Sequence, residues 1–121
     1  MSWWVSLLDD NNQMVEVPKF SEGGTLALGG TTKATLNVTY NYSAHFAQAI
    51  ETIMPNYQGF RELLNGATAS AVAPILAKAA LTLGTIPSSN YWEKDPGNAG
   101  RALNILALWA IIHPNATFEV D

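Results

Sequence analysis

Residues 90–113 read NYWEKDPGNAGRALNILALWAIIH, and they join an aromatic loop, a helix start and the most apolar helical pattern of the chain. Asp95 followed by Pro96 offers an N-cap with proline at the first helical position, and Asn98 is an alternative cap if a turn precedes it. Small and apolar residues then recur at helical spacing and also fill the remaining directions. We therefore expect a helix over about 97–112 that is buried on nearly every side and central to the fold.

The composition of the chain limits the classes of protein to which it can belong. Of its 121 residues, 48% are apolar, 13% are charged and none is cysteine, which predicts one compact domain over residues 1–121 without disulfides or thiol chemistry. A net charge of -4 with only six Lys and Arg residues leaves no basic face for nucleic acid. The start of the chain lacks the pattern of a secretory signal and the apolar helix is too short to cross a membrane, so we expect a cytoplasmic protein without a membrane partner.

The N-terminal part of the chain has the alternation of β-strands. Residues 2–8 and 13–18 are separated by a cluster of turn formers, which predicts a hairpin. Alternation places Trp3 and Trp4 on opposite faces, so one tryptophan is expected inside. Further strands are expected at residues 25–28, at residues 33–40 with Ala34, Leu36, Val38 and Tyr40 on one face, and at residues 116–120.

After residue 43 the period of the apolar residues becomes helical. Helices are expected near residues 44–54, 58–64 and 68–83, and Pro74 predicts either a kink or a turn followed by a new helix. The order of strands, then helices, then one strand indicates an α+β fold. We expect a small, mostly N-terminal antiparallel sheet packed on three to four helices, with the C-terminal helix central.

Several segments together resemble a known group of proteins. The segments are LNVTYNYS at residues 36–43, LNGAT at 64–68, YWEKDPGNAGRAL at 91–103 and HPNATFEV at 113–120. They resemble a family of small uncharacterised proteins encoded by bacteriophages and prophages, and the resemblance covers most of the chain. It implies a phage setting and brings no established activity.

Two aromatic, polar segments occur where elements meet, and their rings suit stacking on a flat molecule. The start of the apolar helix offers free backbone amides, small residues that permit close approach, and an arginine that can fork onto an oxyanion. These features predict a pocket for a small anionic, nucleotide-like ligand, although ordinary helix capping and core packing also explain such residues. The expected ligand-binding residues are Tyr40, Tyr42, Tyr91, Trp92, Asn98 and Arg101.

No pattern of catalytic or metal-binding residues emerges from the sequence. His45 and His113 have no partner at the spacing of a metal site, no spacing pairs two carboxylates, and Ser43 has no adjacent base. We therefore expect a non-enzymatic protein without catalytic residues, cofactor or metal. A hydrolase acting through His45 or Glu93 is the least favoured alternative.

The leading functional hypothesis is a phage protein that sequesters a nucleotide-like molecule, by analogy with proteins that remove the cyclic nucleotide signals of bacterial immunity. The alternative is a protein-interaction module that inhibits a host factor, for which Trp3, Trp4 and the turn at Asp9-Asp10 are the best features. Four Trp, four Tyr and four Phe residues exceed what a domain of this size buries. We therefore also expect a homodimer or a higher homo-oligomer.

Overall fold

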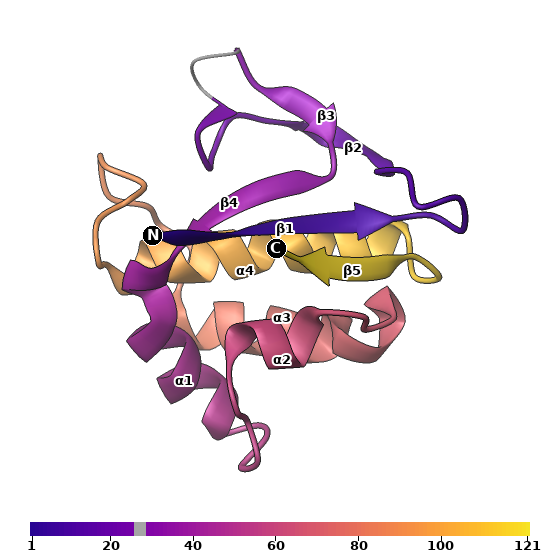
Figure 1. Ribbon diagram of the computed structural model, residues 1–121. Helices are drawn as coiled ribbons and strands as arrows, with labels where there is room; N and C mark the ends of the chain where they lie inside the picture. Colours follow the sequence, from indigo (N-terminus) through magenta and orange to yellow (C-terminus); the bar gives the residue numbers. More distant parts are fainter. Residues whose placement is uncertain (26–28) are drawn as a thin grey trace.

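The N-terminal strand β1 (Ser2–Leu8) lies at the centre of a three-stranded antiparallel sheet in the computed structural model, which describes residues 1–25 and 29–121 (Figure 1). Its neighbours are β4 (Thr35–Thr39) and β5 (Thr117–Val120). The other elements are β2 (Glu16–Phe20), β3 (Thr31–Lys33), the 3-10 helix η2 (Tyr40–Tyr42), α1 (Ser43–Glu51), α2 (Phe60–Leu64), α3 (Ala69–Leu83) and α4 (Pro96–Ile112). The α+β prediction is confirmed, with two small sheets in place of one.

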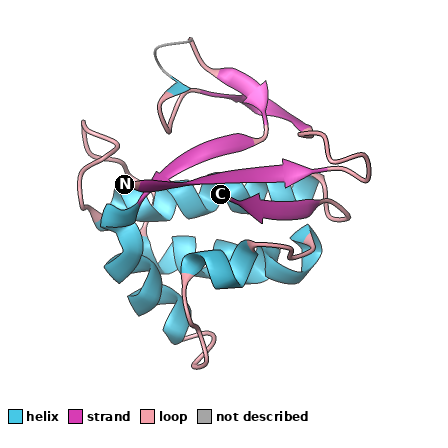
Figure 2. Cartoon of the chain, in the orientation of Figure 1, coloured by secondary structure: helices cyan, strands magenta, loops and turns pink. Residues whose placement is uncertain are grey.

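The predicted hairpin of residues 2–8 and 13–18 forms only at its turn. Leu8 bridges to Met14, and the Val15 amide donates to the Leu7 carbonyl at 3.0 Å. The chain then leaves β1, because β4 and β5 occupy both of its edges, and β2 pairs with β3 as a separate ribbon. The hairpin prediction is therefore wrong beyond the turn. Figure 2 shows this ribbon at the opposite end of the molecule from α1 and α2.

The strand expected at residues 33–40 divides at Ala34 into β3 and β4. Its predicted inner face holds for Ala34, Leu36 and Val38, all fully buried. The prediction is wrong for Tyr40, because this residue leaves the strand to begin η2 and is partly exposed. Of the strand expected at 25–28, residues 26–28 lie outside the described residues, and Thr25 is not in a strand.

The helices cover the face of the main sheet that carries Trp3. In β1, Trp3 packs on Phe46 of α1 and Phe60 of α2, with ring centroids 6.2 and 4.8 Å away. Val5 pairs with Leu36 and Val120 in the neighbouring strands, and all three are buried. Trp4, on the other face, is 47% exposed. The two tryptophans therefore separate as alternation predicts.

The helix α4 begins and ends where the sequence predicts. Asp95 is its N-cap, with Oδ1 accepting from the Asn98 amide at 3.1 Å, Pro96 is in the first turn, and the helix ends before His113. Its buried residues outnumber those of the other helices, so its central place is confirmed. The expectation of cover on nearly every side is wrong for its last turns, where the exposed apolar residues are Leu108, Ile111 and Ile112. Within residues 1–25 and 29–121, no helix has the length and apolarity needed to span a bilayer.

The helices α3 and α4 pack against each other over much of their length. Gly100 of α4 lies so close to the segment that follows α3 that an added Cβ would overlap the Gly84 carbonyl oxygen. A Cβ on Gly97 would overlap the Ile86 carbonyl in the same way. These small residues therefore admit the chain's own backbone, and not a ligand as the sequence suggested. The helix α3 continues through Pro74, so the alternative of a turn and a new helix is wrong. Packing of α3 against α4 and α1 offsets the cost of a proline inside the helix.

Replacing Leu106 with Ala tests the central position of α4. Leu106 is fully buried, so the substitution should lower the free energy of unfolding by about 2 to 5 kcal/mol in a denaturant titration. Leu108→Ala is the matched control on the same helix, because Leu108 is 45% exposed and should lose about 0.5 kcal/mol or less. Equal losses in the two variants would contradict a central α4.

Gly100→Ala tests the contact between α4 and the end of α3. In an open helix this change would stabilise by about 1 kcal/mol, but here the new methyl group would overlap the Gly84 carbonyl. We expect a loss of about 1 to 3 kcal/mol, the usual range for overpacking, by the same titration. Asn104→Ala, at an exposed position of α4, should be neutral or slightly stabilising. A gain in stability at position 100 would rule out the close contact.

Candidate functional site

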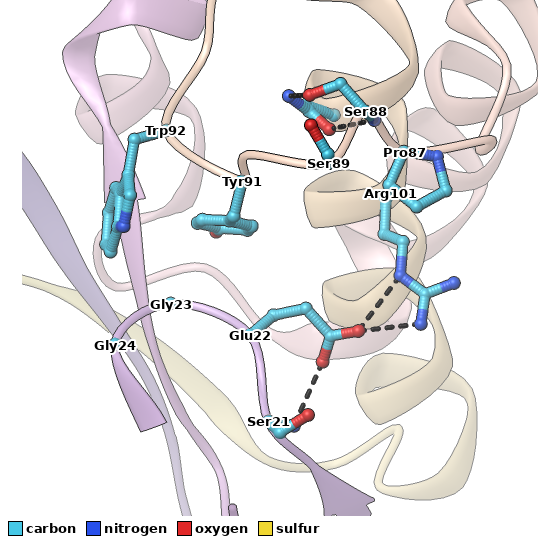
Figure 3. Close-up of a pocket in the computed structure, with 11 residues that line it drawn as sticks. Ser21, Glu22, Gly23, Gly24, Pro87, Ser88, Ser89, Tyr91, Trp92 and Arg101 are labelled. Atoms are coloured by element: carbon cyan, nitrogen blue, oxygen red, sulfur yellow. Dashed lines mark hydrogen bonds and ion pairs between the residues drawn. The ribbon is translucent and has the colours of Figure 1, made fainter. Parts of the chain in front are cut away.

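A hollow of about 500 Å³ lies between the loop after β2, the loop before α4 and the first turns of α4 (Figure 3). This volume suits a small organic molecule. We call it the aromatic hollow. Its lining residues are Ser21, Glu22, Gly23, Gly24, Pro87, Ser88, Ser89, Tyr91, Trp92, Asn98 and Arg101. The structure thus brings together four of the predicted site residues: Tyr91, Trp92, Asn98 and Arg101.

Both loops of the aromatic hollow rest on Asn37 of β4. The Tyr91 hydroxyl donates to the Asn37 carbonyl at 2.8 Å. From the other loop, Gly23 lies so close that an added Cβ would be 2.8 Å from the Asn37 amide nitrogen and carbonyl oxygen, and its φ of +64° favours glycine. The edge of the main sheet therefore sets the distance between the two loops.

Asn98 holds the loop before α4 in place. Its side chain is buried, and its Oδ1 accepts from the Ser88 amide at 2.9 Å. Its Nδ2 donates to the Ser88 hydroxyl and to the Asn90 and Glu93 carbonyls at 2.9 to 3.1 Å. Because these bonds occupy the whole amide group, Asn98 positions the loop and has no donor left for the anion that the sequence assigned to it.

One wall of the aromatic hollow consists of two rings. Tyr91 and Trp92 meet edge to face with centroids 4.8 Å apart, and Figure 3 shows them side by side. Burial raises the pKa of the Tyr91 hydroxyl, and the neighbouring Tyr42 and Glu22 add to the effect. The Trp92 carbonyl accepts from Asn41 Nδ2 at 3.0 Å, and its side chain is 39% exposed. Trp92 therefore offers a partly exposed ring on a fixed backbone.

The opposite wall carries an ion pair that sequence analysis missed. Arg101 Nε and Nη2 donate to Glu22 Oε1 at 3.0 and 2.6 Å, and Glu22 Oε2 accepts from the Ser21 amide at 3.1 Å. Figure 3 shows the Glu22 carboxylate between the Tyr91 ring and the guanidinium. Burial alone would raise the pKa of the Glu22 carboxyl, but hydrogen bonds from Arg101 and from the backbone leave it below its ordinary value. The charged group nearest the rings is thus a carboxylate, and Arg101 is not the free arginine that we expected.

Two of the predicted site residues, Tyr40 and Tyr42, do not line the aromatic hollow. Tyr42 is fully buried behind Tyr91, with ring centroids 5.8 Å apart, because η2 turns it into the core. Its hydroxyl has no hydrogen-bond partner among the described residues, and burial followed by the charge of Asp95 raises its pKa. Tyr40 packs instead on Trp3, with centroids 4.6 Å apart. Both tyrosines therefore support neighbouring structure.

The start of α4 does not leave the open anion site that the sequence suggested. The Asp95 carboxylate accepts from the Asn98 amide, and a second negative charge beside it would be repelled. His45 and Glu93 do not line the aromatic hollow. His113 Nε2 hydrogen-bonds to the Glu16 carbonyl at 2.6 Å. No group of three or more His, Asp or Glu side chains suited to a metal ion occurs in the described part of the chain.

A second hollow of about 320 Å³ lies between β2 and α4, and we call it the basic hollow. It shares Ser21, Glu22 and Arg101 with the aromatic hollow. Its other lining residues are Pro18, Lys19, Phe20, Asn104, Ile105, Leu108 and Trp109. The ion pair of Glu22 and Arg101 therefore stands as a partition between the two hollows.

Comparison with known protein families, with curated proteins and with solved structures finds no match to this chain.

Acid sensitivity tests the ion pair. The pKa of Glu22 lies below its ordinary value of 4.5 in the folded chain, so its stabilising contribution is complete above that value and is lost as the pH falls through the folded pKa. Between about pH 6 and about pH 3, the free energy of unfolding should fall less in Glu22→Gln than in the wild type, by urea titration. Glu93→Gln, at an exposed glutamate outside both hollows, should keep the wild-type dependence. Identical profiles for wild type and Glu22→Gln would contradict the pairing.

Proposed function

We propose that the protein is a non-enzymatic binding protein for a small nucleotide-like molecule whose flat ring lies in the aromatic hollow. The observation that carries the proposal is that the partly exposed ring of Trp92 and a fixed ion pair line the same space of about 500 Å³. Stacking of a base on an aromatic side chain contributes about 1 to 3 kcal/mol and tolerates different bases. The rings therefore supply affinity for a flat molecule.

The polar groups around the rings suit the edge of a nucleobase. Glu22 Oε2 accepts one hydrogen bond, from the Ser21 amide, and a carboxylate oxygen has a further lone pair for a ring N–H or amino group. Ser89 adds a hydroxyl group to the lining, whereas the Ser88 hydroxyl is already bound to Asn90 and Asn98. Because Arg101 fixes the carboxylate through two bonds to Oε1, the acceptor is already oriented before a ligand arrives.

The biological role within this proposal is sequestration of a nucleotide signal in the cytoplasm of a phage-infected bacterium. Support for this setting comes from the resemblance of the sequence segments to phage and prophage proteins. A binding protein without catalysis fits that role, because tight binding alone lowers the free concentration of a signal.

A protein-interaction function is the second candidate, and the surface of α4 favours it. Leu108, Ile111 and Ile112 are 45%, 63% and 43% exposed and follow one another at helical spacing. An apolar patch of this kind is typical of a surface that a protein partner or a second copy of the chain covers.

Titration calorimetry with nucleosides, linear nucleotides and cyclic nucleotides tests the proposed function. The wild type should bind at least one of them, and Trp92→Ala should weaken that binding by about 5-fold to 150-fold, as expected for one lost stacking contact. Trp4→Ala is the matched control, because Trp4 is also an exposed tryptophan and it lines neither hollow.

The negative outcomes separate the two candidates. If the wild type binds no molecule of the panel, the protein-interaction function moves to first place. If Trp92→Ala binds as tightly as the wild type, the ligand does not stack in the aromatic hollow.

A further inference from the structure

We propose that the basic hollow receives the anionic group of the same ligand, with Lys19 and Arg101 binding it on the far side of the Glu22–Arg101 partition. This inference rests on the proposed function, because it concerns the second half of a molecule whose ring lies in the aromatic hollow. The basic hollow thus takes the place of the start of α4, where the sequence suggested that the anionic group would bind.

The two hollows meet at the ion pair. Glu22 and Arg101 line both spaces, so a molecule that passes over the ion pair contacts the aromatic hollow at one end and the basic hollow at the other. The two spaces measure about 500 and 320 Å³. A ring, a sugar and a phosphate in an extended arrangement match this succession of a larger and a smaller space.

The Arg101 guanidinium is only partly occupied by Glu22. Its Nε and Nη2 are used by Glu22, whereas no hydrogen bond to Nη1 occurs within the described residues. In Figure 3 the guanidinium lies beyond Glu22 as seen from the Tyr91 ring. Its side chain is 43% exposed. Arg101 therefore keeps Nη1 as a donor for an oxyanion, and it lines the basic hollow.

Lys19 adds a second basic side chain to the lining of the basic hollow, and it is exposed. The ion pairs of the described residues do not include Lys19. With Arg101 largely neutralised by Glu22, Lys19 gives the basic hollow a net positive charge.

The aromatic hollow itself disfavours an anion. Glu22 is its charged group nearest the rings, and a phosphate placed between Glu22 and Tyr91 would meet a carboxylate at short range. The Asp95 carboxylate has the same effect at the start of α4. The ligand class is therefore a flat, hydrogen-bond-donating ring joined to an anionic group through a spacer about as long as a sugar.

The experiment compares the four ribonucleosides with their 5′-monophosphates by calorimetric titration. In the wild type, the monophosphate of the bound base should bind about tenfold or more tightly than the nucleoside, and added salt should reduce this difference. Lys19→Gln should remove most of the difference while leaving nucleoside affinity unchanged. Lys78→Gln, at an exposed lysine of α3 outside both hollows, is the matched control and should behave as the wild type.

The other possible results distinguish failure of this inference from failure of the proposed function. Equal binding of nucleoside and monophosphate would overturn this inference and leave the proposed function standing. A phosphate advantage that persists in Lys19→Gln would also overturn it, because the anion would then lie elsewhere. Absence of binding by all eight molecules and by the cyclic nucleotides would overturn the proposed function itself.

Discussion

The close approach of the chain at Gly84 and Ile86 to Gly100 and Gly97 is the contact on which the rest of the site depends. Because neither glycine of α4 has a Cβ, the segment that leaves α3 can cross directly over the first turns of α4. The loop that follows is then within reach of Asn98, whose amide binds it at four points. Without this crossing, Tyr91 and Trp92 would have no fixed position.

The sequence predicts best what short-range chemistry decides. Asp95-Pro96 sets the start of α4 through one capping bond, and alternation in β1 separates Trp3 from Trp4. Pairing between strands depends instead on which edges remain free, and no local pattern shows that β4 and β5 occupy both edges of β1. The sequence alone therefore could not predict that β2 and β3 pair as a separate ribbon.

The same division applies to the candidate site. Tyr91, Trp92, Asn98 and Arg101 lie within one short stretch, so a helix start that follows an aromatic loop predicts that they converge. Glu22 reaches Arg101 only through the tertiary fold, because the two residues are 79 positions apart in the sequence. Its position before two glycines resembles an ordinary turn, and only the structure shows that its carboxylate accepts from Nε and Nη2 of Arg101. Tyr42 was expected in the pocket, but η2, a single turn, directs its side chain into the core.

The two walls of the aromatic hollow belong to parts of the molecule with different constraints. One wall stands on α4 and the loop that Asn98 binds, both joined to the main core. The other wall follows β2, which pairs with β3 outside the main sheet. Within β2, Val17 and Phe20 belong to the central packing, whereas Pro18 and Lys19 are exposed. Exposed positions of this kind can change the shape and charge beside the hollows while the core stays the same, so ligand preference can vary there without loss of the architecture.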